Sequence, residues 1–103
     1  MKIIIDIDGT ICSQEENYKD AKPYLKRIYK VNTMYDTGNE IIFFTARGTE
    51  TGIDWSRATR KQLKKWGVKY HKLIFGKPVG DVFIDDRAEK DDFLGDKKWQ
   101  LNE

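Results

Sequence analysis

Residues 3–10 of this 103-residue chain read IIIDIDGT, and this stretch decides the fold. A short run of β-branched apolar residues that ends in Asp8-Gly9 is typical of a buried strand with a polar carboxyl end. Because Asp6 and Asp8 lie two residues apart on this strand, their side chains point the same way. We therefore expect the first strand, residues 3–7, to present two carboxylates at its end.

Outward from this strand, apolar runs alternate with amphipathic stretches. The sequence predicts further strands at residues 41–44, 72–75 and 82–84. A helix is expected to start at Asp20-Ala21-Lys22-Pro23, with apolar positions at Tyr24, Ile28, Val31 and Tyr35, and to end at Gly38. A second helix is expected over residues 55–66, capped by Asp54 and closed by Gly67, with Ala58, Thr59, Leu63 and Trp66 facing inward. The tail after residue 87 supports no assignment.

This order of elements predicts one α/β domain over residues 1–103, with a mostly parallel sheet and helices on both faces. Ligands of such sheets bind beyond the carboxyl ends of the strands. Polar residues gather at those ends in this sequence: Asp6, Asp8, Thr10, Thr45, Arg47, Lys77, Asp85 and Asp86. We therefore expect the functional site at this edge.

Composition narrows the function further. The chain has 19 Lys and Arg against 17 Asp and Glu, a net charge of +2, which favours no dedicated nucleic-acid arm. One cysteine cannot form an internal disulfide, so the chain fits a reducing compartment, and we expect a cytoplasmic protein. No apolar run approaches the roughly 18 residues of a membrane span, so no membrane partner is expected.

The strand ends carry a consistent chemistry. An isolated Asp-x-Asp is as often a turn as a site, but four strand ends with complementary groups favour a site. Four carboxylates at these ends repel one another unless a cation is bound; they belong to Asp6, Asp8, Asp85 and Asp86. With one histidine and one cysteine in the chain, oxygen ligands favour Mg²⁺ over Zn²⁺.

Residues that could bind a phosphate group accompany the carboxylates. Lys77 would place a positive charge on a phosphoryl group, and Thr45 would offer a hydroxyl and a backbone N–H. These are the parts needed for phosphoryl transfer, and an aspartate is the available nucleophile.

Four segments in order resemble the motifs of the haloacid dehalogenase-like (HAD) superfamily, most of whose members are Mg²⁺-dependent phosphatases. They are Asp6-Ile7-Asp8-Gly9-Thr10, Thr45, Lys77 in Gly-Lys-Pro, and Asp85-Asp86 after Val-Phe-Ile. The resemblance covers about residues 3–90 and implies a three-layer, Rossmann-like HAD core.

The resemblance also implies roles for these residues. Asp6 would attack phosphorus and become an aspartyl-phosphate, and Asp8 would act as general acid and then general base. Mg²⁺ would be held by Asp6, the backbone carbonyl of Asp8, and Asp85, with Asp86 as a further or water-mediated ligand. Thr45 and Lys77 would grip the phosphoryl oxygens.

Little chain is left for a cap domain, because residues 11–20 and 46–76 have room for a loop and one helix each. The chain therefore looks like a capless phosphatase with an open site, or one closed by a second copy in a homo-oligomer. Its motifs are similar to those of short proteins of capsule or lipopolysaccharide biosynthesis, which suggests a small sugar phosphate or polysaccharide precursor as substrate.

Two charged features allow more than one interpretation. Arg47 is expected at the edge of the cleft, either holding a second anionic group of the substrate or solvated in a turn. Residues 55–80 hold eight Lys or Arg and no acid, which is typical of a solvated face and less often of a polyanion surface.

Two other kinds of protein share part of this pattern. A two-component receiver domain has similar residues, but its adjacent acidic pair follows the first strand, whereas here Asp85-Asp86 follows the last. A HAD-like module that binds a phosphorylated ligand or partner without turnover is the alternative function.

Overall fold

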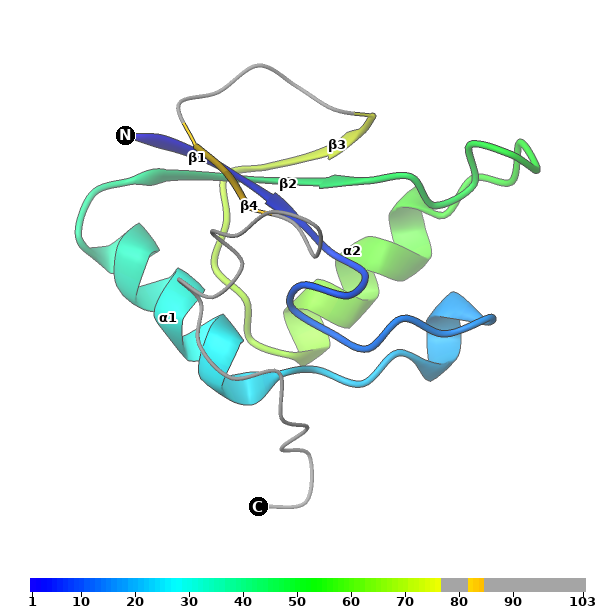
Figure 1. The fold of residues 1–103 in the computed structure, drawn as a ribbon, viewed down its shortest axis with the longest axis horizontal. Helices are drawn as coiled ribbons and strands as arrows, with labels where there is room; N and C mark the ends of the chain where they lie inside the picture. Colours follow the sequence, from blue (N-terminus) through cyan, green and yellow to red (C-terminus); the bar gives the residue numbers. More distant parts are fainter. Residues whose placement is uncertain (77–81, 85–103) are drawn as a thin grey trace.

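A computed structural model of the chain, which describes residues 1–76 and 82–84, contains a four-stranded parallel sheet (Figure 1). Its strands are β1 (Lys2–Asp6), β2 (Glu40–Thr45), β3 (Lys72–Phe75) and β4 (Val82–Ile84). They lie in the order β3-β2-β1-β4, and each neighbouring pair is parallel. The predicted strands and the α/β class are confirmed.

Two α-helices and one short 3-10 helix accompany the sheet. They are η1 (Tyr18–Asp20), α1 (Leu25–Asp36) and α2 (Ser56–Lys65). The carboxylate of Asp54 accepts a 2.9 Å hydrogen bond from the backbone N–H of Ser56, and hydrogen bonding to the side chain and then to the backbone of Ser56 holds the pKa of Asp54 below its usual value. The N-cap of α2 is Trp55, without a side-chain capping bond, so the predicted cap position of Asp54 is wrong: Asp54 lies one residue earlier and holds the turn before the helix.

The predicted start of the first helix is wrong. Asp20 belongs to η1, and the segment before α1 pairs with the loop after β1 through an antiparallel bridge between Cys12 and Pro23. The backbone N–H of Tyr24 donates to the carbonyl of Ile11 at 2.8 Å. These main-chain bonds keep the segment extended, so α1 begins at Leu25.

Both α-helices pack on the same face of the sheet (Figure 1). Side chains of β1, β2, α1 and α2 meet in one apolar cluster: Ile3, Ile5, Ile28, Val31, Met34, Ile41, Phe43 and Leu63. This follows from the strand order, because successive right-handed crossovers from β1 to β2 to β3 run in one direction.

The other face carries Ile4 and Ile42, which alternate with the residues of the cluster and are also buried. The expectation of helices on both faces is not met within residues 1–76 and 82–84, so the described structure does not show a full three-layer core. None of the helices in these ranges is long and apolar enough to cross a membrane.

Candidate functional site at the carboxyl end of the sheet

The loop after β1 turns sharply at the sequence Asp8-Gly9-Thr10. Gly9 has φ +83°, a conformation that side chains with a Cβ rarely adopt. The carbonyl of Ile7 accepts hydrogen bonds from the backbone N–H groups of Thr10 at 3.1 Å and Ile11 at 3.0 Å. The chain thus reverses directly after the two aspartates and leaves them at the end of the sheet.

Asp6 and Thr45 end neighbouring strands. Asp6 is in register with Phe44, the residue before Thr45, so the two residues lie at the same edge. A carboxylate oxygen of Asp6 accepts from the backbone N–H of Ile7 at 2.9 Å. The hydroxyl of Thr45 is buried and accepts from the backbone N–H of Arg47 at 3.1 Å, which fixes the turn after β2.

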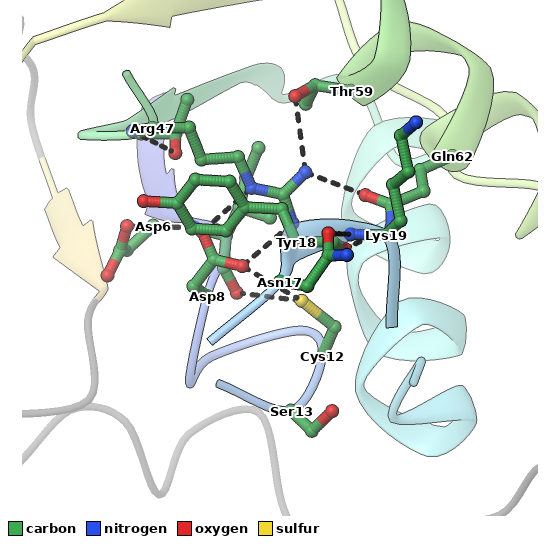
Figure 2. Close-up of polar contacts among 12 residues, drawn as sticks. Asp6, Asp8, Cys12, Ser13, Asn17, Tyr18, Lys19, Arg47, Thr59 and Gln62 are labelled. Atoms are coloured by element: carbon green, nitrogen blue, oxygen red, sulfur yellow. Dashed lines mark hydrogen bonds and ion pairs between the residues drawn. The ribbon is translucent and has the colours of Figure 1, made fainter. Parts of the chain in front are cut away.

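Asp8 and Arg47 form a two-pronged ion pair (Figure 2). Nε of Arg47 donates to Oδ2 of Asp8 at 2.9 Å, and an Nη2 hydrogen is donated to Oδ1 at 2.7 Å. The side chain of Arg47 is 1% exposed and that of Asp8 is 13% exposed. Paired forks of this kind are strong and fix the orientation of both groups.

Arg47 lines the pocket between η1 and α2, but its side chain is more enclosed than expected. Besides Asp8, its Nη1 donates to the hydroxyl of Thr59 at 3.2 Å and to Oε1 of Gln62 at 2.7 Å. Its guanidinium also lies 4.8 Å from the centre of the Tyr18 ring, within cation–π range. The carboxylate and these partners draw the side chain inward, so the alternative of a solvated turn residue is wrong.

Burial and ion pairing act in opposite directions on Arg47. Burial lowers the pKa of its guanidinium, but the hydrogen bond and the charge of Asp8 outweigh burial and raise that pKa above its usual value. The guanidinium of Arg47 is therefore charged at physiological pH.

The sequence did not point to Tyr18 or Gln62, which complete this network. Nε2 of Gln62 donates to the backbone carbonyl of Tyr18 at 2.7 Å, and the Tyr18 ring packs edge-on against Trp55 with centroids 5.0 Å apart. Gln62 follows Thr59 by three residues, so a helical projection would have placed both on one face. For Tyr18 no comparable signal exists, because η1 is positioned by tertiary contacts.

Cys12 lies beneath the carboxylate of Asp8. Its thiol is within 3.7 Å of Oδ1 of Asp8 and 3.6 Å of the carbonyl of Ile7, and it is fully buried. Burial, together with the nearby negative charge of Asp8, raises the pKa of this thiol well above its usual value. Because the thiolate is the nucleophilic form, these surroundings support the interpretation of Cys12 as a spacer rather than a nucleophile.

A pocket of about 530 Å³ opens between the segment 16–18 and the loop 46–55. Ala46, which follows Thr45, is part of its lining, as are Glu16, Tyr18 and Trp55. Its volume lies within the ordinary range for small-ligand sites. A smaller pocket of about 230 Å³ lies between η1 and α2, and Arg47 lines it.

The remaining predicted site residues, Lys77, Asp85 and Asp86, lie outside the described residues. Strand β4 nevertheless fixes the register of the chain that leads to two of them, because Ile84 pairs with Ile5, the residue before Asp6. Within the described ranges, no three His, Cys, Asp or Glu side chains lie close enough together to hold a metal ion.

Comparison with known proteins adds one structural likeness. No protein-family model and no curated protein matches the chain. A crystal structure of a structural-genomics target from Vibrio cholerae is similar to it, with 28% sequence identity and a TM-score of 0.72. The match covers 90% of this chain and 85% of the Vibrio cholerae chain. The α/β fold described above is therefore similar to that of a solved protein over nearly the whole length of both chains.

Proposed function

We propose that this protein is a Mg²⁺-dependent phosphatase that hydrolyses a phosphomonoester through an aspartyl-phosphate on Asp6. The observation that carries the proposal is the meeting of Asp6, Asp8 and Thr45 at one edge of a parallel sheet. The register between Ile5 and Ile84 supports it, because Asp85 directly follows Ile84 in the sequence.

The proposed reaction has two halves. In the first, a carboxylate oxygen of Asp6 attacks phosphorus, the bond from phosphorus to the leaving oxygen breaks, and Asp8 gives that oxygen a proton. In the second, a water oxygen attacks phosphorus and Asp8 takes a proton from the water. The bond between phosphorus and Asp6 breaks, its electron pair returns to the Asp6 carboxylate, and phosphate leaves.

The donor atoms at this edge fit a hard cation. The resemblance assigns the backbone carbonyl of Asp8 to the metal, which is compatible with the contact between the Asp8 carboxylate and Arg47. The Cys12 thiol is buried and stays protonated, and Nδ1 of His71 accepts from the backbone N–H of Ile41, so neither offers a zinc site. Asp6, the Asp8 carbonyl, Asp85 and Asp86 would hold Mg²⁺, which would neutralise phosphoryl charge.

The substrate is proposed to be a small phosphorylated molecule such as a sugar phosphate. The pocket of about 530 Å³ beside Ala46 supports this size class. The aromatic rings of Tyr18 and Trp55 in its lining would pack against a sugar face.

Phosphate release from p-nitrophenyl phosphate, with and without Mg²⁺, tests the proposal. We expect Mg²⁺-dependent turnover by the wild type and none above the blank by Asp6→Asn, which lacks the nucleophile. Asp36→Asn is the matched control, because Asp36 is an exposed carboxylate that pairs with Lys69 at the end of α1. Near wild-type activity in Asp6→Asn would exclude Asp6 as the nucleophile.

The Asp8–Arg47 pair favours a second candidate, a module that binds a phosphorylated ligand without turning it over. Both carboxylate oxygens of Asp8 accept hydrogen bonds here, as they would in a purely structural ion pair. The same assay separates the two functions. Absence of turnover across pH 5 to 9, with retained binding of a phosphate ester measured by calorimetry, would identify the binding module.

A further inference from the structure

We propose that Arg47 is a positioning residue for Asp8: its two-pronged contact fixes the orientation of the Asp8 carboxylate. This inference rests on the proposed function and changes the role expected for Arg47 from substrate binding to control of the acid–base group. It follows from the side chains that Arg47 contacts (Figure 2).

The donors of Arg47 are directed at the protein. Its guanidinium makes four hydrogen bonds to described side chains, two to Asp8 and one each to Thr59 and Gln62. With a side chain 1% exposed, it has little surface left for a substrate. An arginine that gripped a substrate phosphate would instead have to point a free fork into the pocket.

The geometry of the pair suits an orienting role. The two bonds of the fork, at 2.9 and 2.7 Å, fix the plane of the Asp8 carboxylate. Each carboxylate oxygen has two lone pairs, so Asp8 can exchange a proton with a leaving oxygen or a water while Arg47 keeps its orientation.

The surroundings keep Arg47 in place for this task. Thr59 and Gln62 belong to α2, whose position is set by Leu63 in the apolar cluster. The ring of Tyr18 covers the guanidinium from η1. Asp8 is therefore oriented by a cation that is itself held from two separate elements, which is the arrangement expected of a support for a catalytic group.

A double-mutant cycle tests the proposal, with Arg47→Met, Asp8→Asn and the double variant assayed on β-glycerophosphate, whose leaving oxygen needs a proton. We expect Arg47→Met to lower kcat about 10²-fold with little change in KM, because it impairs general acid–base catalysis. In the Asp8→Asn background, Arg47→Met should cost little more, since the group it supports is already lost.

The first turnover with p-nitrophenyl phosphate gives a second readout. Because p-nitrophenolate leaves without a proton, the initial burst of p-nitrophenol should survive in Arg47→Met, while the later steady state, which needs Asp8 as base, slows. Arg47→Lys keeps the charge but loses the fork, so it should recover part of the lost kcat. It also keeps the test available if Arg47→Met does not fold.

Arg57→Met is the matched control, because Arg57 is an exposed arginine on α2, and we expect unchanged kcat. A raised KM with unchanged kcat in Arg47→Met, or an equal loss in the presence and absence of Asp8, would overturn the positioning role and return Arg47 to substrate binding. Absence of turnover by the wild type is a different result, which would remove the proposed function itself.

Discussion

Two buried arginines hold the loop after β1, and they hold it differently. Arg27, on α1, is 1% exposed, and its Nη1 donates to the backbone carbonyl of Thr10 at 2.9 Å. Arg47, after β2, contacts the side chain of Asp8 in the same loop. A hydrogen bond to the main chain fixes the path of the loop. An ion pair with a carboxylate also fixes the orientation of that side chain. The described contact of Arg27 is thus with the backbone of the loop, and that of Arg47 is with a side chain of the candidate site.

The largest difference between the two arginines should appear in stability. Arg47→Met leaves the largely buried Asp8 carboxylate without its cation, and breaking a buried pair in this way costs about 3–5 kcal/mol. Arg27→Met removes the donor that Arg27 offers to the Thr10 carbonyl, which costs about 1–3 kcal/mol. Urea unfolding followed by tryptophan fluorescence measures both.

Removing the charge of Asp8 should affect the stability of the two arginine variants differently. Asp8→Asn should recover part of the stability lost in Arg47→Met, because no unpaired carboxylate remains, but it should recover nothing in Arg27→Met. Equal recovery in both backgrounds would show that the two arginines have the same structural role.

A smaller effect is expected from the turn that carries Arg47. Gly48 has φ +82°, and a Cβ there would clash with the backbone carbonyl of Ile53. Gly48→Ala should cost about 1–3 kcal/mol of stability and also lower kcat, because it displaces the residue next to Arg47.

Gly38→Ala is the matched substitution on the α1 side. Gly38 has φ +99° but open space around the added methyl group, so we expect a smaller loss of stability and unchanged kcat. An equal loss of kcat in both variants would contradict the assignment of the site to the α2 side.

The smallest expected effect is the contribution of the Cys12 thiol, in the same loop, to the pH dependence of stability. Because burial raises its pKa above the ordinary value of 9.0, the folded protein keeps a neutral thiol where the unfolded chain has begun to lose its proton. The stability contributed by the neutral thiol is present below pH 9.0 and declines as the pH rises above it.

Alkylation measures whether the Cys12 thiol is accessible and reactive in the folded protein. Iodoacetamide at pH 8 should leave Cys12 intact in the folded protein and modify it in urea, as mass spectrometry would show. Rapid modification of the folded wild type would contradict the burial of Cys12. The same reaction in Arg47→Met and Arg27→Met would report which arginine keeps the loop closed.

Local patterns predicted the strands well. The β-branched run at residues 3–5 and the apolar run at 41–44 each lie within a single strand, where periodicity is the dominant signal. The contact of Asp54 with the first turn of α2 was also predictable, because it joins residues close in sequence, although the N-cap itself is Trp55.

Features that depend on distant contacts were not predictable. Asp20 and Pro23 look like a helix start, but pairing of Pro23 with Cys12 overrides the local preference. Likewise, Arg47 at a strand end looks exposed, and nothing in the sequence shows that Asp8, 39 residues away, captures it. The location of the candidate site could therefore be predicted, but the partners inside it could not.

The side-chain amide of Gln62 links Arg47 to Tyr18 through two different atoms. Its oxygen faces the cation of Arg47 and its nitrogen faces the carbonyl of Tyr18, so the two ends are not interchangeable. Glutamate has nearly the same shape, but it would place a second anion on Arg47 and an acceptor against an acceptor at Tyr18. Arg47 would then divide its charge between two carboxylates. A change of one atom type on α2 would thus weaken the hold of Arg47 on Asp8 while every residue at the strand ends stays the same.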